Sequence, residues 1–345
     1  VIFNTYQRLR YHPKAAHGAF EDLSALCKRL QSAALFRRAV AALCSYFPPA
    51  QATTTWVLVP PDQIFQVLLD MHQNIPKITR EEDGGENGDG KSSDSKDHVA
   101  RHTLWLYSIN TLASLTKHPR HSIKMIALSS LRTALLASGW SVQNAETWKR
   151  CISKTLVPML NDLANDPAGV QMSQQQLHAA GGGEHKNATK KKQVDLRLAA
   201  ATLLFQTFLQ HMGTLSDMAK FDIFWLTFLG SIEKFMRAPK AESPRSASQL
   251  HVHVTEHFKN LLLVMAASGT FKRASQRSPS GQDLLTLTWA VLERFRPDLR
   301  KQLQELAAGD SQHAPSMATE EPSSQSSMQH ARVQCDAIDP IGKCR

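Results

Sequence analysis

One segment of the chain satisfies the P-loop expression for nucleotide binding. Residues 85–92, GENGDGKS, fit GxxxxGK[ST], a motif in which backbone N–H groups between a buried strand and a helix hold phosphate. The flanking residues 78–83 and 93–97 are too polar for a buried strand or an apolar helix. Glu86 and Asp89 would also repel phosphate. The context favours a chance match over the alternative of a P-loop nucleotide-binding enzyme.

Three histidines form a second candidate. His253 and His257 are four residues apart, which places them on one helical face where they could chelate one metal ion. His251 and Glu256 lie beside them, but the HExxH order and a nearby cysteine are missing. We interpret these side chains as polar positions at the start of an amphipathic helix. We therefore predict no metal ligand, no catalytic residue and no cofactor.

The basic residues are the remaining candidates. The formal net charge is +10, but most Lys and Arg residues are spread singly along predicted helices, as is typical of solvated faces. Two clusters stand out as candidate contacts for an anionic membrane or a protein partner: Lys190, Lys191 and Lys192, and Lys272, Arg273 and Arg277. The five cysteines are scattered and form no CxxC pair, which argues against a disulfide framework and favours a cytosolic location.

Apolar residues recur at helical spacing through most of the chain, and strand-like alternation is almost absent. No apolar run is long enough to span a bilayer. The pattern, with its Pro and Gly breakers, predicts helices near residues 18–32, 33–46, 62–74, 99–117, 121–138, 145–165, 194–212, 217–237, 249–267, 283–295 and 298–307.

The strongest pattern is a pair of helices around residues 197–236 with a short connection at 212–216. So short a connection predicts antiparallel neighbours, with Phe224, Trp225, Phe228 and Ile232 facing the partner helix. Such a pair must stack on others to bury its apolar faces. With pairs about 45 residues apart, the fold class expected is all-α, an armadillo/HEAT-like superhelical array of antiparallel helix pairs.

Polar stretches divide this array. We expect the N-terminal part of the array at 1–79, a disordered polar linker at 80–97, and the C-terminal part at 98–307 with a disordered insertion at 167–192. Further mobile loops are expected at 238–248 and 274–282, and a disordered tail at 308–345. Because residues 1–11 resemble the middle of an apolar helix, we also expect the chain to be a piece of a longer protein.

An ordered series of segments carries a family resemblance. It begins with AFEDLSALCKRLQSA (19–33) and PPDQIFQVLLDMHQNI (60–75), and the other segments occupy residues 123–140, 147–163, 197–215, 224–236, 258–271 and 287–303. Over residues 1–307 the series resembles the C-terminal region of the large Golgi-localised, brefeldin-related guanine-nucleotide exchange factors for Arf GTPases.

The resemblance implies a region without catalytic activity, because the catalytic exchange domain of this family lies upstream. It implies a regulatory scaffold for ER–Golgi vesicle traffic, cytoplasmic and peripherally bound to Golgi membranes. The partners implied are Arf-family or other small GTPases, Golgi adaptors and an anionic membrane surface, with no nucleic acid and no small-molecule substrate. Another HEAT-type trafficking scaffold is the alternative within binding proteins.

Overall fold

A computed structural model of the chain describes residues 2–48, 59–78, 93–137, 144–165, 183–237, 244–277 and 283–303. Within these ranges the backbone is helical with turns between the helices, and it contains no β-strand. The expected all-α class is therefore confirmed, and the superhelical curvature stays a prediction.

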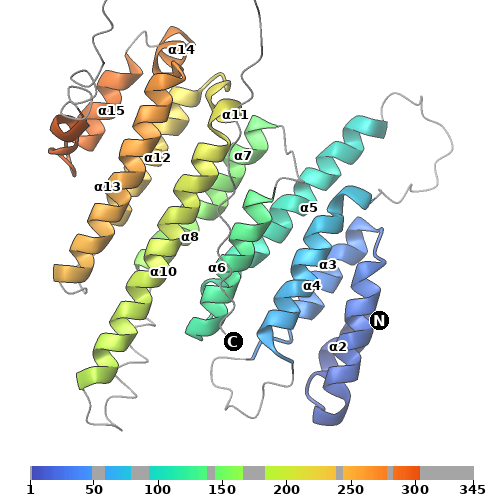
Figure 1. The fold of residues 1–345 in the computed structure, drawn as a ribbon. Coiled ribbons are helices and arrows are strands. Elements are labelled where there is room, and N and C mark those ends of the chain that lie inside the picture. The colour runs from blue at the N-terminus through green and yellow to red at the C-terminus, as the bar shows by residue number, and fades with distance from the viewer. Residues whose placement is uncertain are drawn as a thin grey trace, which may run out of the picture. The chain divides into compact units, whose positions relative to one another are not determined.

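The helices follow one another along the chain with short connections where both ends are described (Figure 1). Their bounds are α1 (Ile2–Leu9), α2 (Pro13–Lys28), α3 (Ala33–Cys44), α4 (Pro61–Asn74), the 3₁₀ turn η2 (Ile75–Lys77), α5 (Ser93–Leu115), α6 (His121–Leu136), α7 (Ala145–Cys151), the π-helical segment η3 (Ile152–Leu156), α8 (Val157–Ala164), α10 (Gly183–Gln210), α11 (Met212–Ser216), α12 (Phe221–Arg237), α13 (Pro244–Ala267), α14 (Thr270–Arg277) and α15 (Leu284–Leu292).

These helices form two layers. In the first layer α2, α4, α6, α10 and α13 pack side by side in that order. In the second layer α1, α3, α5, the α7–η3–α8 segment, α12 and α15 do the same. Each successive pair thus contributes one helix to each layer, which is the packing of a helical repeat array.

Ring contacts fix the helix directions. Phe205 of α10 packs on Phe228 of α12, and Phe208, one turn later, stacks on Phe224, one turn earlier. The order of contacts is reversed, so α10 and α12 are antiparallel, as predicted. In contrast, Thr202 and Phe205 of α10 contact His253 and His257 of α13 in the same order. Thus α10 runs antiparallel to α12, the other helix of its pair, and parallel to α13, its neighbour in the first layer.

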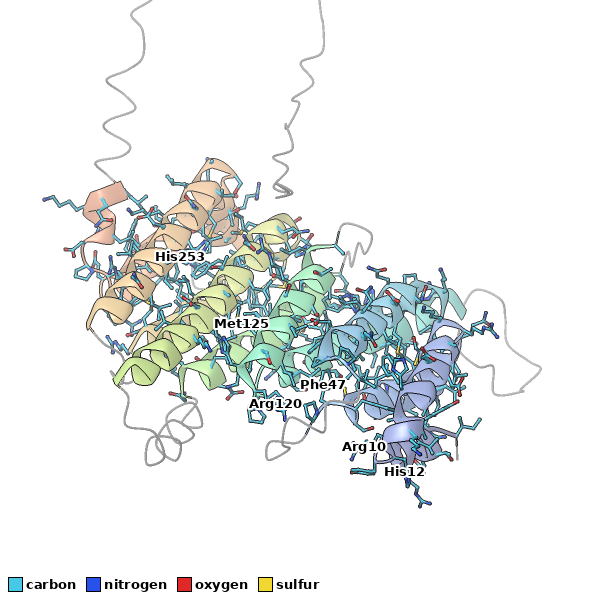
Figure 2. The ribbon with its side chains drawn as sticks, turned by 60° about the horizontal axis from the view of Figure 1, so that its bottom comes forward. Arg10, His12, Phe47, Arg120, Met125 and His253 are labelled. Carbon is cyan, nitrogen blue, oxygen red and sulfur yellow. The ribbon has the colours of Figure 1, made fainter. Side chains whose placement is uncertain are left out.

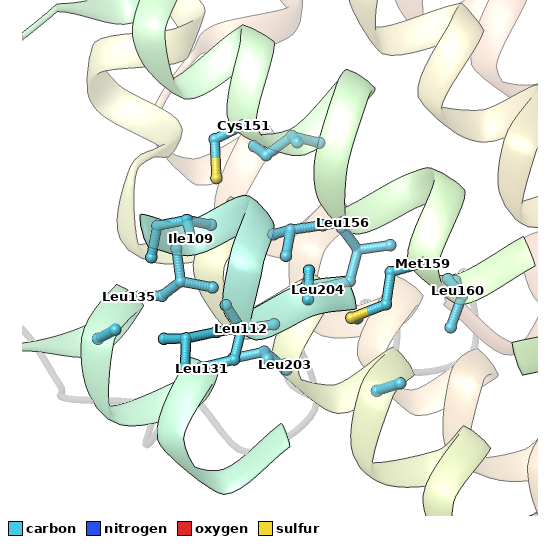
Figure 3. Close-up of a cluster of buried hydrophobic side chains, with 14 of the residues drawn as sticks. Ile109, Leu112, Leu131, Leu135, Cys151, Leu156, Met159, Leu160, Leu203 and Leu204 are labelled. Carbon is cyan, nitrogen blue, oxygen red and sulfur yellow. The ribbon is translucent and has the colours of Figure 1, made fainter. Parts of the chain in front are cut away.

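The core lies between the layers. The four side chains predicted to face the partner helix are all buried, with Trp225 at 0% and Phe228 at 2% exposure. Trp225 Nε1 donates to Thr288 Oγ1 over 2.8 Å, so the indole N–H is satisfied inside the core. A second cluster fills the junction of α5, α6, α8 and α10, where Figure 3 shows Ile109, Leu131 and Leu204 among its members.

Three helices begin earlier than their apolar periodicity indicates. α5 begins at Ser93, α10 at Gly183 and α13 at Pro244, five to eleven residues before the expected starts at 99, 194 and 249. The extra turns are polar, so they leave no apolar stripe to detect. Glu, Ala and Lys in the first turns of α10 nevertheless favour helix. The predicted linker 80–97 and insertion 167–192 were thus wrong for 93–97 and 183–192, and their other residues lie outside the described ranges.

Other differences have local causes. The end of α14 was expected to lie in the loop 274–282. The apolar stripe of this helix is too short to be detected, because its buried residues are Thr270, Phe271 and Ala274. The helix predicted at 145–165 contains the π-helical segment η3 just before Pro158. A proline lacks the N–H for the regular ladder, and a wider turn accommodates that loss. The predicted tail 308–345 lies outside the described residues.

Candidate functional site: a basic edge of the array

The predicted basic contacts occupy different environments. Lys192 is exposed on α10, whereas the side chains of Lys190 and Lys191 lie outside those that the structure describes. Lys272 and Arg273 are exposed on α14.

Arg277 is the exception because it is engaged within the fold. Its Nη1 donates to the backbone oxygen of Ser216 over 3.3 Å and lies 3.6 Å from Asp217 Oδ1. It therefore fastens α14 to the end of α11, and a structural role accounts for its position.

The two predicted clusters lie near opposite ends of the first-layer helices, measured along the helix axes. Because α10 and α13 run parallel with Thr202 beside His253, Lys192 lies level with the beginning of α13, and Lys272 follows the end of that helix. With a rise of about 1.5 Å per residue, the two levels are roughly 35 Å apart. The clusters cannot form one patch, and each must be considered alone.

Lys192 lies close to other basic side chains from α6. The positive charges of Lys192 and Lys124 both act on His121 at the start of α6, and Asp195 is the carboxylate that opposes them. Lys124 also acts on His118, together with Arg120. The packing of α6 on α10 within one layer produces this convergence. We call His118, Arg120, His121, Lys124 and Lys192 the basic edge.

The turn between α5 and α6 holds the basic edge in place. Arg120 N donates to His118 Nδ1 over 3.1 Å, so that nitrogen is the acceptor and His118 Nε2 carries the hydrogen. His118 Nε2 in turn donates to the backbone oxygen of Pro48 over 2.9 Å. The His118 ring also packs on Phe47, which Figure 2 shows on the same side of the molecule as Arg120. The turn is therefore tied to the chain that follows α3.

The electrostatics of the basic edge favour an anion. Burial lowers the pKa of His121, and Lys192 and Lys124 lower it further. Burial also lowers the pKa of His118, against the effect of its bond to Pro48, and Arg120 and Lys124 add to the lowering. Lys124 is only 5% exposed. Positive charge that gathers at one place on a protein surface attracts anions.

Sequence reasoning identified Lys192 but missed its neighbours on α6. A signal was present, because residues 117–124 read KHPRHSIK and contain five basic side chains in eight positions. The convergence itself depends on α10 lying next to α6, and residues about 70 positions apart give no local sign of that contact.

The other motifs acquire no catalytic geometry. Residues 85–92 lie outside the described ranges, and α5 begins at Ser93 directly after them with the polar residues 93–97. On the other side the chain forms a 3₁₀ turn at 75–77 and no strand within 59–78. A P-loop needs the strand as well as the helix.

Metal and pocket chemistry are similarly limited. Among the described residues, no group of three or more His, Cys, Asp or Glu side chains could hold a metal ion. A hollow between α8 and α12 is lined by apolar and hydroxyl side chains, and another beside α1 contains Arg38 as its charged residue. Neither hollow places an acid beside a base. None of the described helices has the length and apolar character to cross a bilayer.

The geometry thus defines a helical repeat protein whose most distinctive surface is a basic edge. The family model described as the GBF1-like, tetratrico peptide repeat region matches residues 105–299. The match spans more than half of the 345 residues, and the chain belongs to this family. The family's description names tetratricopeptide repeats, which, like armadillo and HEAT repeats, are stacked helical units.

Two relatives bear out the resemblance to Arf exchange factors. The ARF guanine-nucleotide exchange factor GNOM of Arabidopsis thaliana is 28% identical over 227 residues, which are 66% of this chain and 14% of that protein. The Golgi-specific brefeldin A-resistance guanine nucleotide exchange factor 1 homolog of Caenorhabditis elegans is 24% identical over 203 residues, 57% of this chain and 8% of that protein. The chain thus corresponds to a small part of either relative. No solved structure matches it.

Proposed function

We propose that this chain is a non-catalytic docking region of an Arf guanine-nucleotide exchange factor in ER–Golgi vesicle traffic, and that its basic edge binds the anionic cytosolic leaflet of Golgi membranes. The observation that carries the proposal is the convergence of basic side chains from the α5–α6 turn and α10. Family membership supports the exchange-factor context, since the matched region is a repeat region. In this proposal the exchange chemistry belongs to a domain outside this chain.

The proposal selects between the two predicted basic clusters. At the basic edge, the opposing carboxylate is Asp195 and the cations lie on neighbouring helices of one layer. At the other end Arg277 is held by Ser216 and Asp217, which leaves Lys272 and Arg273 as the candidate contacts there. Lys190 and Lys191 precede Lys192 on α10, and we retain them as predicted additional contacts.

Liposome flotation tests the proposal with a matched control. Arg120→Gln combined with Lys192→Gln removes two positive charges from the basic edge, and Lys272→Gln combined with Arg273→Gln removes two from the opposite end. Each basic residue near an anionic surface contributes about 1 kcal/mol, so the first variant should lose roughly thirtyfold in partitioning to phosphatidylserine vesicles. The control variant should bind like the unmodified chain.

The flotation experiment also varies the salt concentration and the lipid composition of the vesicles. Binding should weaken as ionic strength rises, because the Debye length shortens to about 8 Å at physiological salt. Pure phosphatidylcholine vesicles should not float the chain. If the unmodified chain ignores anionic vesicles at low salt, membrane docking is wrong for this region. An acidic surface on a small GTPase or a Golgi adaptor then becomes the leading interpretation of the basic edge.

A further inference from the structure

A second polar cluster lies away from the basic edge, between α10 and α13. His253 Nε2 lies 3.0 Å from His257 Nε2 and 2.8 Å from Thr202 Oγ1. The two histidines are one turn apart on α13, and the hydroxyl comes from α10. Figure 2 shows His253 in the region where these two helices pack. Two ring nitrogens and one hydroxyl oxygen are therefore gathered around one point.

The hydrogen bonds assign the protons of this cluster. Thr202 Oγ1 has one hydrogen, and it is given to the backbone oxygen of Leu198 over 2.9 Å, since a carbonyl can only accept. Thr202 Oγ1 must then accept from His253, so His253 Nε2 carries a hydrogen. His257 Nε2 lies next to that hydrogen and is the acceptor, with its own hydrogen on Nδ1. One hydrogen thus lies among His253 Nε2, His257 Nε2 and Thr202 Oγ1, three atoms that can each coordinate a metal ion.

The surroundings keep His257 suited to metal binding. Its ring stacks on Phe205 with an interplanar angle of 9°, which fixes the direction of Nε2. Burial lowers its pKa, and His253 lowers it further. Both histidines are half-buried, so solvent can supply further ligands.

We propose that Thr202, His253 and His257 form a binding site for a divalent transition-metal ion across the α10–α13 contact. The ion takes the place of the hydrogen between the two ring nitrogens, and the hydrogen of His253 moves to Nδ1, so the charge of the ring is unchanged. Solvent completes the coordination. This proposal does not depend on the proposed membrane docking.

The distance between the nitrogens indicates which ions fit. Two nitrogens 3.0 Å apart, each about 2.1 Å from one ion, subtend an angle of about 90°. That angle is typical of square-planar or octahedral sites, whereas a tetrahedral site would need the nitrogens further apart. Imidazole ligands with an oxygen in this geometry favour Ni²⁺ or Cu²⁺ over Zn²⁺.

Calorimetric titration of the full chain with Ni²⁺ tests the site. We expect one site of highest affinity, weakened about tenfold or more in His253→Asn and in His257→Asn. His251→Asn, on the same helix but outside the cluster, is the matched control and should leave the affinity unchanged. Equal losses in all three variants, or none in the first two, would show that the site does not exist.

A second measurement needs no variant and so does not depend on their folding. Substoichiometric Ni²⁺ is added to the unmodified chain while the imidazole signals of its 15 histidines are followed by NMR. Paramagnetic broadening should reach His253 and His257 first. If other histidines broaden first, the metal binds elsewhere and the proposal is overturned.

Discussion

Histidines in the interior of the array and histidines at its basic edge have lowered pKa values for different reasons. In the interior, the rings of His72, Trp105, Trp148 and His211 form a ladder through α4, α5 and α7 to the end of α10, with centroid distances of 6.3, 5.0 and 3.5 Å. Burial alone lowers the pKa of His211 to about 4, and it lowers that of His72 to about 4 against one opposing hydrogen bond. At the basic edge, neighbouring cations contribute as well as burial.

The difference separates stability from binding. In the ladder the neutral ring is a packing element, and charging it would place an ion in the core. At the edge the neutral ring results from crowded positive charges, and a change in those charges changes the ring. Substitutions in the interior should therefore alter unfolding, whereas substitutions at the edge should alter titration and binding.

The largest effect is expected from the aromatic contacts between α10 and α12. Phe228→Ala removes a ring that is 2% exposed and packs on Phe205 and Phe208, so it should lower the free energy of unfolding by about 3 to 5 kcal/mol. Chemical denaturation measures this loss. The matched control is Ile223→Ala on the same helix, where the side chain is 58% exposed and the change should stay within about 0.5 kcal/mol. Similar losses in both variants would mean that the α10–α12 contact does not stabilise the array.

The next largest effect is a loss of stability at acidic pH. The pKa of His72 is about 4 in the folded chain against 6.5 for the ordinary side chain. Between these values the unfolded chain binds more protons, so stability is fully present above pH 6.5 and is lost as the pH falls toward 4. A shift of this size corresponds to about 3 kcal/mol.

Denaturation at several pH values checks this expectation. His72→Gln keeps a polar group near Ser108, which His72 Nδ1 contacts over 3.1 Å, and it should flatten the pH dependence of unfolding between 6.5 and 4. His12→Gln removes an exposed histidine and should leave the dependence as it was. If both variants keep the full slope, His72 is not the group that titrates on unfolding.

The sequence predicted the interior much better than the basic edge. Helix α4 was expected at 62–74 and spans Pro61–Asn74, because its apolar spacing and its proline at the start are local signals. Helix α14 was not predicted, because it has no long apolar stripe. It is held instead by its packing on α13 and α15. The neighbours of Lys192 and the partner of His253 were missed for another reason. Both depend on which helices lie side by side within a layer, and apolar periodicity gives the face of a helix but not its neighbour.

The smallest effect on stability, and the sharpest test of the comparison, comes from Lys192→Gln. Lys192 is exposed, so the free energy of unfolding should change by no more than about 0.5 kcal/mol. Its charge opposes protonation of His121 across the α6–α10 contact, so the substitution should raise the pKa of His121 toward the ordinary value. NMR titration of the His121 ring measures this shift, and Lys272→Gln should leave it unchanged because that residue lies at the opposite end of the layer. The pKa of His72 should stay constant in both variants, since burial dominates it. If the pKa of His121 is the same in Lys192→Gln as in the unmodified chain, the cations do not converge. The proposal of membrane docking would then have no supporting observation.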